Sequence, residues 1–269
     1  MSDKKNDESI DAVDGEFVAE RDTVEGERPK RHSKLGRGIY LLPNLFTTAS
    51  LFSGFYAIVA GMDGNFDNAA IAIFVSMILD GLDGRVARMT NTQSEFGAEY
   101  DSLADMVAFG VAPALVAFSF NLQSLGNLGW IATFIYVAGA ALRLARFNTQ
   151  IGSVDKRYFV GLPSPAAAAV VAGFVWATHS FEQTKVLTFF TMFVVASAGV
   201  LMVSNVLYHS FKEVDMKRRV PFTALLVMVL IFAVVALEPS LVLLGGFFLY
   251  ALSGPFNTFI LKGRKKTED

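Results

Sequence analysis

Four aspartates lie in one short polar stretch between two strongly apolar segments. They are Asp80, Asp83, Asp101 and Asp105. Residues three or four positions apart share a face of a helix, so each pair would point in one direction. We expect two helices joined by the polar turn at residues 90–95, which would bring the two pairs opposite each other.

Carboxylates gathered in this way repel one another strongly unless cations lie between them. Oxygen-only ligands suit Mg²⁺, Mn²⁺ or Ca²⁺, and four negative charges match two divalent ions. The spacing therefore predicts a two-metal site. The alternative is that some of the aspartates pair with neighbouring arginines, for which the candidates are Arg85, Arg88, Arg143 and Arg146.

The elements that must position these side chains are membrane helices. The chain is 53% hydrophobic and 18% charged, and a bilayer-spanning helix needs about 20 apolar residues. We expect an all-α integral membrane protein, a polytopic bundle of about eight transmembrane helices. They cover approximately residues 44–61, 67–88, 97–120, 127–147, 164–181, 184–205, 220–237 and 239–261.

The basic residues indicate how the bundle is oriented. All but Lys185 of the 23 Lys and Arg residues fall on one side of the predicted spans. By the positive-inside rule that side is cytoplasmic, and the loop of the aspartates is on it. We therefore expect a multi-pass protein of the cell (inner) membrane with a cytoplasm-facing active site and both termini in the cytoplasm.

Three regions follow from this pattern. Residues 1–33 form an acidic and basic tail without hydrophobic periodicity, which predicts disorder. Residues 34–261 form the membrane domain, and residues 262–269 form a basic C-terminal tail. The chain has no cysteine, which excludes disulfides and thiol chemistry.

The aspartates belong to a longer pattern, Asp80-x2-Asp83-Gly84-x2-Ala87-Arg88-x8-Gly97-x3-Asp101-x3-Asp105. This pattern resembles the signature of the CDP-alcohol phosphotransferase family, whose membrane enzymes join a CDP-linked lipid or alcohol to an acceptor hydroxyl and release CMP. Within the family the chain is most similar to the bacterial phosphatidylserine synthases. That narrower resemblance rests on residues 43–47, 141–148, 161–165 and 201–205.

The resemblance implies roles for the matching positions. Asp80, Asp83 and Asp101 would hold one divalent cation, and Asp80, Asp101 and Asp105 would hold the other, with Mg²⁺ or Mn²⁺ as the ion. Asp105 would also accept the proton of the attacking hydroxyl. The residues implied in CDP-diacylglycerol binding are Asn44 at the nucleotide end, Ser94 near the phosphates, and Gly84, Ala87 and Arg88 along the pocket.

A basic pair near the end of the fourth predicted span has two interpretations. Arg143 and Arg146 are three positions apart, so they share a face at the end of the fourth predicted span. We favour an anion pocket for the acceptor carboxylate or the lipid phosphate, with Asn148 as a weaker neighbour. The alternative is a topology anchor of the positive-inside kind.

The predicted activity is transfer of the phosphatidyl group of CDP-diacylglycerol to L-serine by direct attack of the serine hydroxyl. A two-step route is less favoured because no activated nucleophile is apparent. The resemblance also implies a homodimer in membrane lipid, and no nucleic-acid partner is expected. The alternatives are another acceptor (glycerol 3-phosphate or an inositol phosphate), an ion or metal transporter, and a non-catalytic lipid-binding scaffold.

Overall fold

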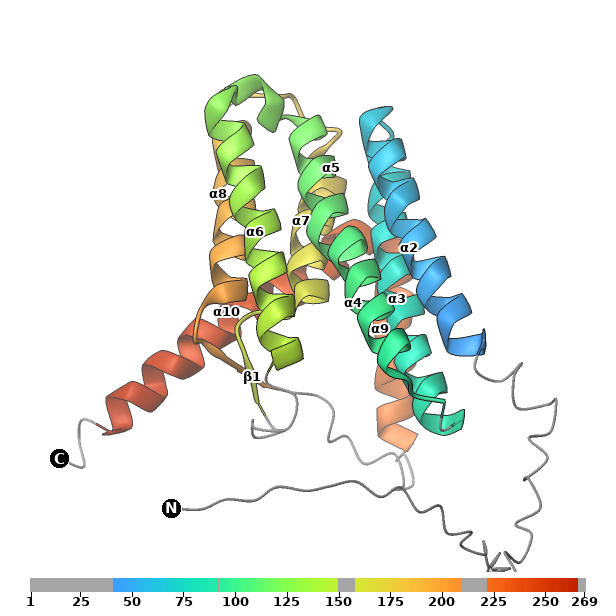
Figure 1. Cartoon of the computed structure of the whole chain (residues 1–269). Coiled ribbons are helices and arrows are strands. Elements are labelled where there is room, and N and C mark those ends of the chain that lie inside the picture. Colours follow the sequence, from blue (N-terminus) through green and yellow to red (C-terminus); the bar gives the residue numbers. More distant parts are fainter. Residues whose placement is uncertain (1–40, 91, 150–157, 210–221, 266–269) are drawn as a thin grey trace, which may run out of the picture. The chain divides into compact units, whose positions relative to one another are not determined.

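The part of the chain that the structure describes is almost entirely helical. The computed structural model describes residues 41–90, 92–149, 158–209 and 222–265. Each of the eight apolar segments expected from the sequence is helical there (Figure 1). The helices are α2 (Leu41–Met62), α3 (Phe66–Thr90), α4 (Glu95–Asp105), the π-helical segment η1 (Met106–Val111), α5 (Ala112–Phe120), the 3-10 helix η2 (Leu122–Leu125), α6 (Asn127–Thr149), α7 (Ser164–Thr178), α8 (Lys185–Val203), α9 (Phe222–Leu237) and α10 (Pro239–Lys265). The predicted tail at residues 1–33 lies outside the described residues, as do residues 266–269.

Five of these helical stretches are long and apolar enough to cross a membrane. They are α2, the continuous run of α4, η1 and α5, and the helices α6, α8 and α10. The predicted all-α polytopic membrane fold is thereby confirmed. α7 and α9 are apolar but shorter, and α3 carries the charges of the aspartate motif, so the count of eight spans stays a prediction.

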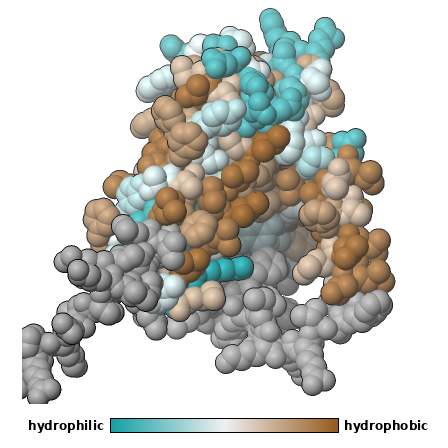
Figure 2. All heavy atoms as spheres, turned by 90° about the vertical axis from the view of Figure 1, so that its right-hand side faces the viewer, coloured by the Kyte–Doolittle hydropathy of each residue, from teal (hydrophilic) through white to brown (hydrophobic). Residues whose placement is uncertain are grey.

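The outer faces of the helices are apolar, as contact with lipid requires. Phe52 on α2, Trp130 on α6 and Phe193 on α8 are each more than 60% exposed. Figure 2 shows hydrophobic residues over the middle of one face, with hydrophilic residues gathered at its upper end. A surface of this kind is unfavourable in water and favourable in hydrocarbon.

Small residues let the helices approach closely at the centre. α7 contacts α3, α5, α8 and α10, and its alanines at 166–169 are all buried. Between α6 and α8, a Cβ on Gly139 would lie 2.4 Å from the Gly199 carbonyl oxygen. Glycine at both positions is what allows the two backbones to touch, and α6 is the helix that carries Arg143 and Arg146.

A π-helical segment follows Asp105 directly. η1 continues α4 without a break and passes into α5, so the predicted span at residues 97–120 is one continuous helix that is not α-helical throughout. Each turn of a π-helix holds more residues than an α-helical turn, and such segments are frequent at functional sites. The apolar sequence from Met106 to Val111 gives no indication of it, because its residues suit either kind of helix.

A short antiparallel ribbon was not predicted. β1 (Tyr158–Val160) pairs with β2 (Leu207–His209), with Phe159 opposite Tyr208. The Tyr208 hydroxyl donates to the Ala251 carbonyl oxygen at 3.0 Å, which fastens α10 to the ribbon. Burial raises the pKa of Tyr208 to about 12, so its hydroxyl remains a donor at neutral pH.

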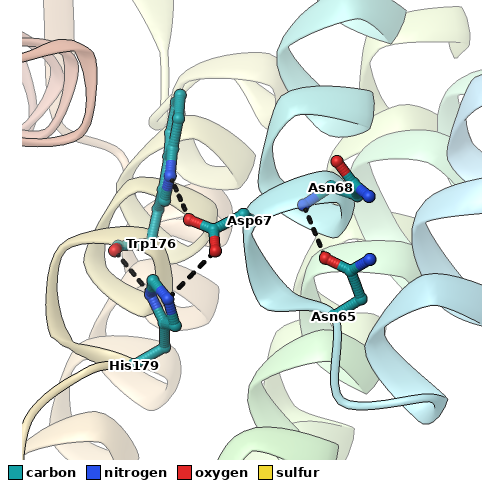
Figure 3. Close-up of polar contacts among 5 residues, drawn as sticks. All are labelled: Asn65, Asp67, Asn68, Trp176 and His179. Carbon is teal, nitrogen blue, oxygen red and sulfur yellow. Dashed lines mark hydrogen bonds and ion pairs between the residues drawn. The ribbon is translucent and has the colours of Figure 1, made fainter.

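The helices from α2 to α8 alternate in direction if α4, η1 and α5 are taken as one, so two ends of the bundle can be distinguished. The C-terminal ends of α3 and α6 and the N-terminal ends of α4 and α7 lie at one end (Figure 1). At the other end, Asp67 of α3 accepts a hydrogen bond from the Trp176 indole at 2.9 Å and pairs with His179 at 3.1 Å (Figure 3). This cluster ties α3 to α7 far from the aspartate motif, and Asn65 accepts from the Asn68 amide at the start of α3 (Figure 3).

Candidate active site

The aspartate motif forms a helical hairpin, as its spacing predicts. α3 ends at Thr90 and α4 begins at Glu95. Ser94 caps α4, because its hydroxyl accepts the Gly97 amide at 3.0 Å. Counting from the turn, Asp80 precedes the end of α3 by ten residues and Asp105 follows the start of α4 by ten. Both carboxylates therefore lie about 15 Å from the turn, at matching heights.

Three of the four carboxylates form one tight cluster. Each of Asp80, Asp101 and Asp105 offers one oxygen such that these atoms all lie within 4.8 Å of one another. The pairing is antiparallel: the Asp80 side chain meets that of Asp105, and the Asp83 side chain meets that of Asp101. The expected meeting of the two pairs across α3 and α4 is what the structure shows.

Asp83 is held from a third helix. It is 5% exposed, and its Oδ2 accepts a hydrogen bond from Thr47 Oγ1 of α2 at 2.8 Å. Thr47 is itself 4% exposed. The same hydroxyl lies 3.1 Å from the Pro43 carbonyl oxygen, and since it has one proton, it donates to one acceptor at a time. α2 thus supplies a donor to the edge of the carboxylate cluster.

The cluster fits hard divalent cations. Its ligand atoms are all carboxylate oxygens, which suit Mg²⁺ and Mn²⁺. Asp101 Oδ1 is buried and has no hydrogen-bond partner among the described residues. A buried carboxylate oxygen without a donor is costly unless a cation satisfies it. The donor set and this unpartnered oxygen both point to a bound cation.

The residues expected at CDP-diacylglycerol lie between the cluster and the turn of the hairpin, on α3 and beside Gly97 of α4. On α3, a Cβ on Gly84 would lie 3.6 Å from Arg88 Nη1, so the guanidinium passes over the glycine, and it interacts electrostatically with Asp83. Ala87 is half-buried on the same helix. On the α2 side, Asn44 Oδ1 and Ser94 Oγ both lie beside Gly97.

Gly81 and Gly84 leave the backbone of α3 accessible. Among the described residues, and apart from the backbone of α3 itself, nothing lies within 4 Å of the position that a Cβ on Gly81 would take, and only the Arg88 side chain lies that close at Gly84. A ligand can therefore approach the α3 backbone closely at this height. The Ser94 hydroxyl already accepts the hydrogen bond that caps α4, so any contact of Ser94 with phosphate would use the same hydroxyl group.

The three residues of the predicted anion pocket have different partners in the structure. Arg143 is the member nearest the aspartates: it interacts electrostatically with Asp105, and its Nη1 donates to Ser164 Oγ at 2.8 Å. Arg146 lies lower on α6 and donates to Asn205 at 3.4 Å. Asn148 bonds with Ser102 of α4 at 3.1 Å, one residue from Asp101. Of these three residues, Arg143 is the one that interacts electrostatically with the carboxylate cluster.

Two residues that bond with predicted site residues, Thr47 and Ser164, are not among the site residues predicted from the sequence. Thr47 and Ser164 lie in the stretches 43–47 and 161–165 that carry the narrower family resemblance. A hydroxyl side chain near a helix end is most often a cap. The sequence around Thr47 and Ser164 therefore does not indicate that they bond with the distant residues Asp83 and Arg143. The stretches themselves were the available indication.

Comparison with known proteins gives a consistent result. The family model described as CDP-alcohol phosphatidyltransferase matches residues 40–186, which include all four aspartates. The chain is 41% identical over 216 residues to the CDP-diacylglycerol–serine O-phosphatidyltransferase of Helicobacter pylori, covering 80% of this chain and 90% of that relative. It is 34% identical over 220 residues to the protein of the same name from Mycobacterium tuberculosis, covering 80% and 77%.

One solved structure that the chain resembles is that of Mycobacterium tuberculosis phosphatidylinositol phosphate synthase with CDP-DAG bound. It is 19% identical and covers 63% of this chain and 87% of that chain. The TM-score is 0.47, and at that level the likeness supports no argument about this site.

Proposed function

We propose that this chain, which belongs to the CDP-alcohol phosphatidyltransferase family, transfers the phosphatidyl group of CDP-diacylglycerol to the hydroxyl of L-serine. The products are phosphatidylserine and CMP. The observation that carries the proposal is the meeting of Asp80, Asp101 and Asp105 across α3 and α4. The choice of serine as acceptor is supported by the shared name of the relatives at 34–41% identity.

Two divalent cations, Mg²⁺ or Mn²⁺, complete the site in this proposal. Asp80, Asp101 and Asp105 hold one, and Asp83 joins Asp80 and Asp101 around the other. When bound, such a pair supplies charge stabilisation to the diphosphate and to the leaving CMP. Support comes from the all-oxygen donor set and from the unpartnered Asp101 Oδ1.

The chain's own residues position the reactants and move the proton. The serine hydroxyl oxygen forms a bond to the lipid-linked phosphorus while the bond from that phosphorus to CMP breaks. Asp105 takes the hydroxyl proton as the new bond forms. Arg88, lying over Gly84, offers a planar guanidinium to the diphosphate or to the developing charge on CMP. No covalent link to the protein is needed.

The acceptor approaches from the α6 side. Arg143 is the partly buried cation that interacts electrostatically with Asp105, and a carboxylate placed on it would bring the serine hydroxyl within reach of that aspartate. Arg146 and Asn148 lie further along α6 on different faces, with Arg146 donating to Asn205 and Asn148 to Ser102. Asn44 and Ser94 stand on the opposite side, beside Gly97, where the nucleotide is expected.

The orientation and assembly remain as the sequence predicts. The motif loop, the end of α6 and the start of α7 share one end of the bundle, and the charge asymmetry assigns that end, with both termini, to the cytoplasm. The homodimer stays part of the proposal on family grounds alone.

An acceptor panel with metal removal tests the proposal. Purified full-length protein in mixed micelles is given CDP-diacylglycerol with L-serine, glycerol 3-phosphate or an inositol phosphate in turn, and CMP release is followed. We expect turnover with serine, its loss on chelation with EDTA, and recovery on adding Mn²⁺ or Mg²⁺. Preference for a phosphate-bearing acceptor would reassign the substrate, while undiminished turnover in EDTA would contradict the metal site.

One substitution separates catalysis from binding alone. Asp105→Asn keeps the size of the side chain but removes the base and one anionic ligand, so we expect turnover to fall by about a thousandfold or more. A lipid-binding scaffold predicts no such loss. The matched control is Asp67→Asn at the other end of the bundle, which should keep turnover within about twofold.

A further inference from the structure

Arg143 is partly buried and has spare hydrogen-bonding capacity. Its Nη1 donates to Ser164, but its Nε is buried and has no hydrogen-bond partner among the described residues. A guanidinium carries five N–H donors, and a buried donor left unpaired is costly. The arrangement is that of a cation prepared for an anionic ligand, because the side chain is placed but not satisfied.

Ser164 is the residue that fixes the position of the Arg143 guanidinium. This residue is 1% exposed and begins α7. Its hydroxyl oxygen accepts from Arg143 at 2.8 Å. An arginine side chain has about 2 kcal/mol of rotamer entropy to lose, so a fixed acceptor at one end of the guanidinium limits the directions in which the remaining donors can point.

The backbone before α7 fixes Ser164 in turn. Gly161 has a φ of +82°, its amide donates to Val206 at 2.8 Å, and the Leu162 amide donates to Leu201 at 3.0 Å. A Cβ on Gly161 would lie 2.3 Å from the Met202 carbonyl oxygen. The backbone at Gly161 is therefore fixed against the end of α8, and this fixes Ser164, at the start of α7, beside Arg143 of α6.

The hydrogen-bond partner of Arg143 is uncharged as well as fixed in position, and both properties affect how the guanidinium can bind an anion. An aspartate or glutamate at residue 164 would cancel the charge of Arg143, whereas a hydroxyl orients the guanidinium and leaves its charge available. We propose that Ser164 is a positioning residue that aims Arg143 at the anionic group of the acceptor, and so sets affinity and selectivity for that acceptor. This inference rests on the proposed function, in which the acceptor's carboxylate lies on Arg143.

Steady-state kinetics of position 164 test the proposal. Ser164→Ala, Ser164→Cys and Ser164→Thr are measured in the full-length protein, with L-serine and CDP-diacylglycerol varied separately. Alanine and cysteine lack a good acceptor, so we expect KM for L-serine to rise about tenfold while KM for CDP-diacylglycerol and kcat stay within about threefold. Threonine keeps the hydroxyl and should restore KM for serine to within about threefold. Cysteine nearly fills the volume of serine, which guards against a loss due to a cavity.

The coupling to Arg143 is measured by a double-mutant cycle. In an Arg143→Lys background, Ser164→Ala should raise KM for serine by less than about twofold further, because Ser164 acts only through the guanidinium. The matched control is Ser197→Ala on α8, a half-buried serine whose hydroxyl donates to Val194 of its own helix. It should leave every kinetic constant within about twofold, and thermal unfolding midpoints confirm that each variant is folded.

Two results would overturn the inference. One is an equal rise of KM for both substrates in Ser164→Ala, and the other is a full tenfold effect that persists in the Arg143→Lys background. If the acceptor panel instead identifies a phosphate-bearing acceptor, the proposed function fails, and the same comparison on that acceptor still decides the role of Ser164.

Discussion

The hydrogen bond from Thr47 to Asp83 allows one proposed cation site to be perturbed without touching a ligand. Thr47→Val replaces the hydroxyl with a methyl of nearly the same size, so packing between α2 and α3 is kept. What is lost is the 2.8 Å donor to Asp83 Oδ2. Both ends of that bond are about 95% buried, so water cannot readily replace the donor.

The size of the effect follows from this geometry. A hydrogen bond to a charged group contributes about 1.5–3 kcal/mol, and loss of a residue that orients a metal ligand typically weakens metal affinity or activity by about 10–100-fold. We therefore expect Mn²⁺ to bind Thr47→Val about 10–100-fold more weakly. Turnover at low Mn²⁺ should fall by a similar factor and recover when Mn²⁺ is raised.

The measurement is a Mn²⁺ titration of purified protein followed by electron paramagnetic resonance, which reports binding independently of turnover. Thr133→Val is the matched control. Thr133 is also a buried threonine, at 8% exposure, but its hydroxyl donates only to Gly129 of its own helix at 2.8 Å. Equal Mn²⁺ dissociation constants, within about twofold, for the two variants would refute the role assigned to Thr47.

Two further predictions concern the scaffold. Gly199→Ala places a Cβ 2.8 Å from Tyr136 Cα, which should destabilise the α6–α8 contact by about 1–3 kcal/mol. Its thermal unfolding midpoint in detergent should fall below that of Gly246→Ala, where no described residue outside the helix's own backbone lies within 4 Å of the new Cβ. Equal midpoints would count against close backbone packing. Trp176→Phe removes the indole donor to Asp67 and should cost about 1 kcal/mol of stability with kcat unchanged, so a loss of turnover at full folding would show that the two ends of the bundle are coupled.

Much of the fold could be predicted because long apolar runs in a membrane have few alternatives to helix. All eight segments expected from residues 44 to 261 are helical, and their boundaries shift by only a few residues. It was also predictable that Asp80 and Asp105 face each other. The two aspartate pairs are spaced by three and four residues, and a short turn between their helices leaves little freedom in how the pairs meet. These features depend on local pattern alone.

Other features depend on contacts between distant parts of the chain, and these could not be predicted. The donation from Thr47 to Asp83 spans 36 residues, and that from Arg143 to Ser164 spans 21. The β1–β2 ribbon has three residues in each strand, too few for a period-two pattern to be recognised. Arg143 and Arg146 share a helix face in sequence, yet only the tertiary structure shows that the first faces Asp105 and the second Asn205.

The π-helical segment Met106–Val111 is the one place between α4 and α5 where the chain can lose a residue with little rotation of its ends. A π-helical turn amounts to one residue inserted into an α-helix, and its wider turn absorbs that residue. Deleting a single residue there would restore an ordinary α-helix and leave Asp101 and Asp105 in nearly the same orientation relative to α5. In-frame loss of one codon in this stretch should therefore be less damaging than the same loss elsewhere in α4 or α5, where it would rotate the aspartates by about 100° relative to the residues that follow.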